Sequence, residues 1–219
     1  MTVRPECSMI EEIKGRIMKI SDLTHSQLTE AVTLEFDEGS PCYIRRGGNW
    51  KNKDLKDIKR HKGIVYFISV NDEIVKIGGS SGKIGDLLSQ YLINLESKAE
   101  PRENRFCLHL RTLAHLVRGD VVKYHFIPVQ DMSTHFEGMF GEMLTAHHRE
   151  FRIVESRLID QFKIMTGDVP AWNNTEGKIG WSDDFIKIFD DREMALKSGD
   201  DEVFDYDEFI ANNCEVALT

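Results

Sequence analysis

The chain of 219 residues has few cysteines and no long apolar run. Its four cysteines are widely spaced and form no Cys-x-x-Cys pair, which argues against a structural zinc site. No stretch of about eighteen apolar residues occurs, so we expect no transmembrane helix. The first residues lack the apolar core of a signal peptide, and together with the scattered cysteines this predicts a reduced, cytoplasmic protein.

A net positive charge is also missing, because the formal net charge is −9. The excess of acid lies at one end: residues 182–219 contain twelve Asp and Glu against three Lys and Arg, so residues 1–181 are neutral. Within that neutral part, residues 45–62 hold eight basic and two acidic residues, a local charge of +6. Such a local field can bind phosphates even in an acidic protein, although composition alone favours a solvated linker or helix face.

The apolar content of 41% suits a globular protein with a buried core. From hydrophobic periodicity we expect strands over 64–70, 73–77 and 121–129, and helices within 80–95, 101–118 and 144–165. These elements predict an α/β (α+β) fold with a small, mainly antiparallel three-stranded sheet flanked by helices. We divide the chain into an N-terminal accessory region over 1–60, which holds most of the basic segment, a core over 61–178 and an acidic C-terminal extension over 179–219.

Glu155 is the unusual member of the expected helix over 144–165. It lies four residues after Phe151 and three before Leu158, which places a carboxylate on the apolar side of that helix. Burial of a carboxylate is unfavourable unless the charge is paired or binds a cation. A Mg²⁺ ion is one such cation, since it takes one or two carboxylates and keeps several waters. Pairing with Arg152 or another arginine is the alternative, and from the helix alone it is the more common arrangement.

Two short motifs on the expected hairpin carry a family resemblance. Gly63–Tyr66 and Lys76–Gly78, followed by Glu155–Phe162 and Pro170–Asn174, resemble the motifs of the GIY-YIG nuclease superfamily over about residues 62–175. The lysine in the second motif, where many members have tyrosine, is similar to a type II restriction endonuclease branch. The resemblance implies a GIY-YIG-like core that hydrolyses phosphodiester bonds in DNA with a divalent metal.

The resemblance also implies roles for single residues. Tyr66 would be the general base or the group that orients the attacking water, and Lys76 would lower its pKa or hold the scissile phosphate. A free phenol has a pKa near 10, so a base role near neutrality needs a neighbouring cation. Glu155 would bind Mg²⁺ or another divalent cation, and Asn173 would support the site.

Contacts with DNA are expected from two places. Gly79 and Ser80, at the end of the second motif, would let the backbone approach a phosphate closely. The basic region would hold the backbone of double-stranded DNA through Arg45, Arg46, Lys51, Lys53, Lys56, Arg60 and Lys62. Because double-strand cleavage of twofold-symmetric DNA needs two active sites, we expect a homodimer or higher homo-oligomer.

Cooperation between Tyr66 and Lys76 sets a geometric condition on the hairpin. A two-residue loop of Asn71 and Asp72 would by itself send the two side chains to opposite faces. A loop of odd length or a bulge would bring them to one face. The resemblance therefore predicts an irregularity in this hairpin.

One position departs from the family pattern in a way that bears on activity. Leu87 occupies the usual position of an arginine that stabilises the transition state, and loss of one such donor lowers a rate by roughly a hundred- to a thousandfold. Restoring arginine at position 87 would then raise cleavage, unless Arg102, Arg105 or Arg111 already supplies the charge. A catalytically inactive DNA-binding protein on a nuclease core is accordingly the alternative function. A third is an interaction domain whose acidic tail imitates nucleic acid or inhibits binding.

Overall fold

A computed structural model of the chain describes residues 17–24, 28–47, 50, 61–93, 103–129, 132–137, 143–148, 150–173, 186–187, 190–191 and 194. Its elements are η1 (Ile20–Asp22), β1 (Thr29–Phe36), β2 (Ile44–Gly47), β3 (Ile64–Val70), β4 (Glu73–Ser80), α3 (Ile84–Tyr91), α4 (Glu103–Val117), β5 (Val122–Pro128), β6 (Met132–Glu137), β7 (Met143–His148) and α5 (Glu150–Thr166). The mixed composition of helices and strands agrees with the expected α+β class.

The main sheet has five strands in the order β2-β1-β5-β3-β4, and all of its pairings are antiparallel. The expected strands β3, β4 and β5 are present, but the expected number of three is wrong. Two further strands come from the region before residue 60, because β1 pairs with the edge of β5 that β3 leaves open. The reason lies in the alternation of β1, whose Val32 and Leu34 are buried in the common core. Residues 29–47 therefore belong to the same sheet as the hairpin.

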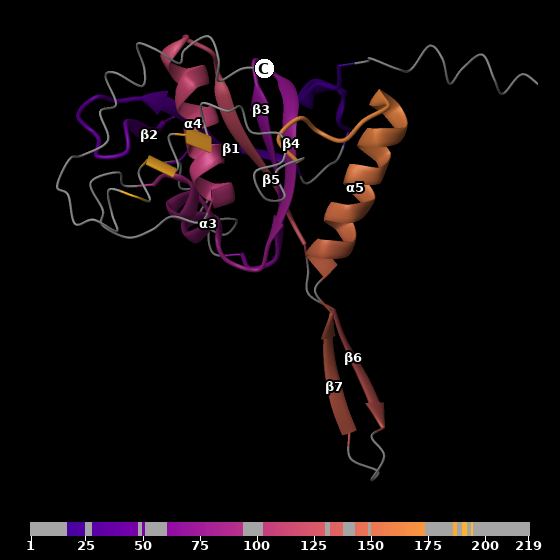
Figure 1. Cartoon of the computed structure of the whole chain (residues 1–219). Helices are drawn as coiled ribbons and strands as arrows, with labels where there is room; N and C mark the ends of the chain where they lie inside the picture. Colours follow the sequence, from indigo (N-terminus) through magenta and orange to yellow (C-terminus); the bar gives the residue numbers. More distant parts are fainter. Residues whose placement is uncertain are drawn as a thin grey trace, which may run out of the picture.

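Helices cover both faces of this sheet (Figure 1). Alternate residues of β3 point to the two sides, so that Tyr66 and Ile68 join one core with α3 and α4. Val65 and Phe67 join the other core, with Phe151 and neighbouring apolar residues of α5. All seven residues of β3 are buried, as a strand covered on both faces requires.

The helix α5 begins later than we expected. Residues 143–148 form strand β7, which pairs with β6 from Met132↔His148 to Glu137↔Met143, so the helix begins only at Glu150. The expectation of a helix from residue 144 was wrong because Leu144 continues the spacing of apolar residues of α5, and local spacing does not reveal a pairing partner. The β6–β7 ribbon extends away from the sheet and from α5 (Figure 1).

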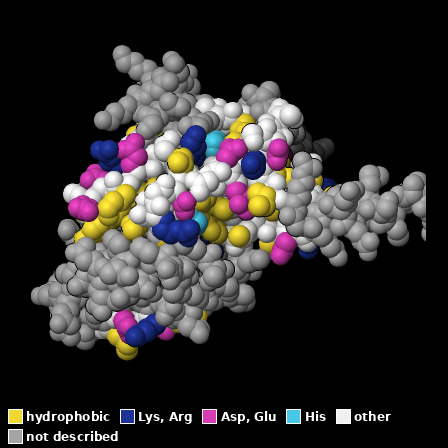
Figure 2. Space-filling view, turned by 90° about the horizontal axis from the view of Figure 1, so that it is seen from above, with side chains coloured by type: hydrophobic (Ala, Val, Ile, Leu, Met, Phe, Trp, Pro, Cys, Tyr) yellow, Lys and Arg dark blue, Asp and Glu magenta, His cyan; other side chains and the backbone are white. Residues whose placement is uncertain are grey.

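The surface of the described residues has mixed charge. In the view from above, Lys and Arg side chains lie beside Asp and Glu side chains, with hydrophobic side chains between them (Figure 2). Among the described residues, no helix combines the length and the apolar character needed to cross a membrane. Of the acidic extension, the structure describes Ile186, Lys187, Asp190, Asp191 and Met194, and Ile186 packs against the core beneath α3 and α4.

Candidate active site

The β3–β4 hairpin turns in the way its sequence predicts. Asn71 and Asp72 form a two-residue turn in which both residues have positive φ, 48° and 74°, and Val70 pairs with Glu73. Asparagine and aspartate tolerate this left-handed conformation better than other non-glycine residues. With this turn alone, the residues on the two strands would alternate in a simple register, and the tyrosine and lysine of the two motifs would face opposite sides.

A bulge in β4 changes that register. Pairing shifts by one residue between Ile68 and Ser69, and Val75 becomes an extra residue on β4. Lys76 then lies opposite Ile68, two residues along β3 from Tyr66 and on the same face. The expected irregularity is confirmed, in the form of a bulge rather than an odd loop.

The residues singled out by the motifs line one cavity of about 460 Å³ at the β4 edge of the sheet. Tyr66 and Lys76 reach it from the hairpin, Glu155 from α5, and Asn173 from the segment after α5. Helix α4 lines the cavity from the other side. The phenol, ammonium and carboxylate groups thus converge on one space.

Two consecutive glycines of β4 make this convergence possible. A Cβ atom at Gly78 would run into the phenol of Tyr66. A Cβ atom at Gly79 would lie 2.5 Å from Oε2 of Glu155 and 2.7 Å from Cδ2 of Phe151, closer than real side chains approach. The backbone N–H of Gly79 also donates a hydrogen bond to the Glu155 carboxylate. The glycines therefore allow the tyrosine and the glutamate to pack directly on the strand from its two faces.

The side chain of Asn173 pairs with the backbone at the open edge of β4, as a neighbouring strand would. The backbone N–H of Ile77 donates to Oδ1 of Asn173 at 2.9 Å, and Nδ2 of Asn173 donates to the carbonyl of Ile77 at 2.7 Å. One residue earlier, the N–H of Trp172 donates to the carbonyl of Val75 at 2.8 Å. The carbonyl of Trp172 in turn accepts a hydrogen bond of 3.1 Å from Nζ of Lys76. This segment closes the sheet edge and fixes the lysine.

The phenol of Tyr66 is held in its protonated form. Its hydroxyl group lies 2.7 Å from the hydroxyl group of Tyr91 at the C-terminal end of α3. Burial, followed by the interaction with Tyr91, raises the pKa of Tyr66 well above its usual value, and burial also raises the pKa of Tyr91. A neutral phenol fits the water-orienting role better than the role of general base.

The two charged groups of the cavity are both destabilised by burial. Burial, with a smaller contribution from Arg111, lowers the pKa of Lys76 to about 8, although Glu155 acts in the opposite direction. Burial also raises the pKa of Glu155, although the N–H of Gly79 and the charges of Lys76 and Arg152 oppose that shift. A bound cation would relieve the burial of this carboxylate.

The donor set fits magnesium better than a transition metal. Among the described residues that line the cavity, Glu155 is the one carboxylate. No group of three or more His, Cys, Asp and Glu residues suited to a metal occurs in the described part of the chain. Mg²⁺ is commonly held by one or two carboxylates together with waters and phosphate oxygens, so a single glutamate suffices for it.

Leu87 does not reach the cavity. It is 4% exposed and packs in the core beneath α3 and α4. An arginine at this position would place a charge in that core, which is unfavourable. Two of the three arginines considered as substitutes, Arg105 and Arg111 of α4, do line the cavity, whereas Arg102 lies outside the described residues.

The described residues of the basic segment over 45–62 do not line the cavity. Arg45 and Arg46 lie on β2, at the opposite edge of the sheet from β4. Arg45 pairs with Glu35 at 2.6 Å, and the guanidinium of Arg46 lies 5.0 Å from the ring centre of Trp50. Lys62 is exposed, directly before β3. Four of the expected DNA contacts lie outside the described residues, namely Lys51, Lys53, Lys56 and Arg60.

Gly79 and Ser80 lie where the motif predicted, and Gly79 lines the cavity. Two residues of the site were missed from the sequence. Tyr91 lies one helical turn after Leu87 on α3, and Cys107 lies one turn before Arg111 on α4. The spacing of four residues on a helix was the available signal for both.

No protein-family model matches the chain, and no curated protein matches it either. Among solved structures, the chain is similar to a mutant of EndoII from bacteriophage T4, with 16% sequence identity and a TM-score of 0.48 over 67% of this chain and 96% of that chain. It is also similar to the restriction endonuclease Hpy188I in complex with product DNA, with 16% identity and a TM-score of 0.39 over 74% of this chain and 88% of that chain. Because both TM-scores lie below 0.5, neither likeness establishes a shared fold or a shared activity.

The lowered pKa of Lys76 predicts a pH-dependent difference in stability. Between pH 8 and 10.5 the unfolded chain binds a proton at this lysine that the folded chain has lost, so the free energy of unfolding rises with pH. Relative to Lys76→Met, the wild type should gain about 3 kcal/mol across that interval. Urea unfolding in EDTA at a series of pH values measures this difference. The exposed Lys163→Met on α5 is the control, and a Lys76→Met curve parallel to wild type would contradict the prediction.

The close packing at Gly79 predicts that alanine lowers stability more there than at Gly82, three residues later. The added Cβ atom of Gly79→Ala pushes the side chains of Glu155 and Phe151 away from β4, and the substitution should destabilise the protein by about 1–3 kcal/mol. Gly82→Ala meets Oγ of Ser80 at 3.5 Å and Cβ of Asp86 at 3.9 Å, both ordinary contacts, and should change stability by less than about 1 kcal/mol. Thermal and urea unfolding of the two variants compare them directly, and equal effects would show that the strand and helix are not packed as described.

Proposed function

We propose that the chain is a metal-dependent DNA endonuclease of the type II restriction enzyme kind, with a GIY-YIG-like core. The observation that supports this most strongly is the convergence of Tyr66, Lys76 and Glu155 on one cavity at the edge of β4. These groups come from the β3–β4 hairpin and from α5, and a bulge is needed to bring the first two to one face. The positions at which the family resemblance places functional groups thus coincide in space.

The chain's own residues divide the chemistry of phosphodiester hydrolysis between them. The Tyr66 hydroxyl, fixed by its hydrogen bond to Tyr91, orients the attacking water. The Lys76 ammonium, held by the Trp172 carbonyl, binds a non-bridging oxygen of the scissile phosphate. Glu155 would hold Mg²⁺, which when bound supplies positive charge that stabilises the leaving oxygen. Asn173 keeps β4 in place through its two hydrogen bonds to Ile77.

Arg111 supplies the charge that the family draws from the position of Leu87. Arg111 and Lys76 line the same cavity, and the positive charge of Arg111 contributes to the lowered pKa of Lys76. Both cations then face the phosphate that Lys76 binds. Because α3 and α4 pack on the same face of the sheet, an arginine on either helix can approach the cavity from the same direction. Stabilisation of a phosphoryl transition state depends on the position of the charge, whichever helix carries it.

Double-stranded DNA as the substrate, and a homodimer as the active form, belong to this proposal. Of the residues expected to contact DNA away from the cavity, Arg45 and Arg46 lie on the opposite edge of the sheet, and Lys62 is exposed directly before β3. Arg45 and Arg46 therefore engage phosphates distant from the cleaved bond. A catalytically inactive DNA-binding protein is the second candidate, and the leucine at position 87 is the observation that favours it.

Cleavage of DNA tests the proposed function directly. Wild-type protein with Mg²⁺ should convert supercoiled plasmid to a defined set of fragments, and EDTA should stop the reaction. Glu155→Gln should lower the rate by about a hundredfold or more and weaken Mn²⁺ binding in calorimetry. Glu150→Gln, on the same helix but outside the cavity, is the matched control and should retain both properties. DNA binding without cleavage by the wild type would support the second candidate instead.

The arginine assignment predicts which substitutions slow the reaction. Arg111→Gln should lower kcat by about a hundredfold with little effect on KM, because the lost charge acts mainly in the transition state. Arg118→Gln, on the exposed end of the same helix, is the control and should cut at the wild-type rate. Leu87→Arg should destabilise the protein without increasing the rate. A sharp increase with Leu87→Arg, together with an active Arg111→Gln, would instead assign the missing charge to position 87.

A further inference from the structure

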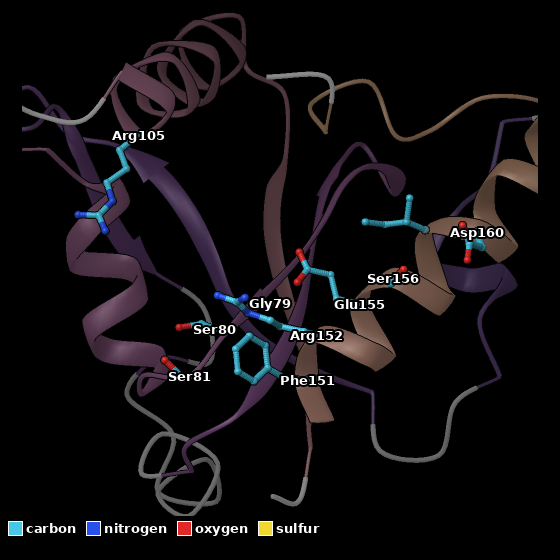
Figure 3. Close-up of a pocket in the computed structure, with 10 residues that line it drawn as sticks. Gly79, Ser80, Ser81, Arg105, Phe151, Arg152, Glu155, Ser156 and Asp160 are labelled. Atoms are coloured by element: carbon cyan, nitrogen blue, oxygen red, sulfur yellow. The ribbon is translucent and has the colours of Figure 1, made fainter. Parts of the chain in front are cut away.

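A second cavity, of about 680 Å³, adjoins the candidate active site. The two cavities share Gly79, Arg105, Glu155 and Ile159, so they meet at the carboxylate expected to hold the metal. The second cavity continues from there along the N-terminal half of α5 and the end of β4, past Arg152 and Ser80 (Figure 3). Beyond the metal ligand Glu155 and the close approach of a phosphate expected at Gly79 and Ser80, the roles proposed above assign nothing to this space.

The end of this cavity near β4 is rich in hydrogen-bond donors. Ser80 and Ser81 follow Gly79 at the end of the strand, and Arg152 extends toward them from α5 (Figure 3). Oγ of Ser80 already accepts a hydrogen bond of 3.1 Å from the N–H of Gly82, which leaves its own proton to donate to a ligand. Guanidinium and hydroxyl donors in one small space are the usual partners of a phosphate group.

The acidic residues of the cavity do not oppose this assignment. Asp160 lies eight residues after Arg152 on α5, about 12 Å along the helix axis, and Figure 3 shows it away from Ser80 and Ser81. Glu155, the other acid, is the expected metal ligand, and a bound cation would neutralise it. Asp160 is therefore separated from the basic end of the cavity, which lies against Gly79 and beside Glu155.

A plainer interpretation assigns Arg152 to its own helix. Arg152 and Glu155 are three residues apart, and the charge of Arg152 opposes the raised pKa of the Glu155 carboxyl, so the two groups interact. Such a pair would exist without any ligand. It does not explain why the serine hydroxyls gather at the same end, and it makes a different prediction for DNA.

We propose that Arg152, Ser80 and Ser81 form a subsite for the phosphate of the nucleotide next to the scissile bond. This inference rests on the proposed nuclease function and adds the path of the DNA strand, from the cavity of Tyr66 past Glu155 toward the end of β4. Arg105 also lines both cavities, from α4.

Neutralising single phosphates in the substrate tests the subsite. Once a cleaved bond has been mapped on defined DNA, duplexes are made with an uncharged methylphosphonate at each phosphate that flanks it. With wild-type protein, the methylphosphonate at one of the two flanking positions should lower kcat/KM by about tenfold, which corresponds to the loss of one charge-assisted hydrogen bond. Arg152→Gln should cut the unmodified duplex about tenfold more slowly but lose no more than about twofold from the same modification. If either modification slows Arg152→Gln by the same factor as it slows the wild type, at both flanking phosphates, the proposal is overturned.

Arg157→Gln is the matched control, because Arg157 is an exposed arginine on the same helix that lines neither cavity. It should keep the wild-type rate and the full tenfold response to the modified phosphate. Thermal unfolding of both variants shows that each is folded. An identical response of Arg152→Gln and Arg157→Gln would mean that Arg152 makes only the contact within its helix.

A binding measurement separates failure of this inference from failure of the proposed function. The affinity for DNA is measured against salt concentration in Ca²⁺ or EDTA, where no cutting is needed. Arg152→Gln should reduce the slope of log affinity against log salt by about one, the loss of one phosphate contact, while Arg157→Gln leaves it unchanged. If wild type cuts no DNA but this difference remains, the nuclease function fails and the phosphate subsite stands. Equal slopes for the two variants overturn the subsite whether or not DNA is cut.

Discussion

The single extra residue in β4 is the constraint on which the site depends. Ile74 and Ile77 are three positions apart, yet both pack in the core against α5. In a regular strand, residues three apart face opposite sides, so only the bulge at Val75 allows this arrangement. The same bulge turns Lys76 toward the other face, where it meets Tyr66. Without it, either the ammonium group or an isoleucine would be forced into the wrong environment, and the core against α5 would oppose any return to a regular register.

The open edge of β4 then becomes the place where the cavity forms. An edge strand presents unpaired N–H and carbonyl groups, which proteins usually cover or pair. Here the side chain of Asn173 pairs with one residue of the edge, and the carboxylate of Glu155 accepts the N–H of Gly79 further along it. The groups that satisfy the backbone are therefore also groups of the candidate site. A substitution in either would disturb the sheet edge and the chemistry together, and the two effects must be separated by measuring stability and rate independently.

Burial makes this site unstable in a way that favours a charged ligand. It lowers the pKa of Lys76 and raises the pKa of Glu155, so each group resists its charged form when no ligand is present. A phosphate beside the ammonium and a cation beside the carboxylate would restore favourable partners for both. A site preorganised in this way loses stability in the free protein and gains interaction energy when the substrate binds.

Local patterns in the sequence were sufficient for the elements that hold the central residues. The hairpin, α4, β5 and most of α5 follow from periodicity, and the resemblance placed Tyr66, Lys76, Glu155 and Asn173 in one cavity. Long-range pairing could not be read in the same way. Strand β1 pairs with β5 across more than eighty residues of sequence. The apolar spacing of β7 continues that of α5, and only its pairing with β6 identifies it as a strand.

The sequence could not predict which arginine replaces the charge missing at position 87, for a related reason. The sequence shows that α4 carries two arginines, Arg105 and Arg111, but only the rotation of the packed helix brings both of them to the cavity. Arg111 and Cys107 lie one turn apart and both line the cavity, whereas Arg118 follows the end of α4 and is exposed. Packing against the sheet fixes that rotation through residues such as Phe106 and Leu110, which are fully buried. The leucine at position 87 is then consistent with an intact site, because the core that buries it also turns the neighbouring helix so that its arginines face the same cavity.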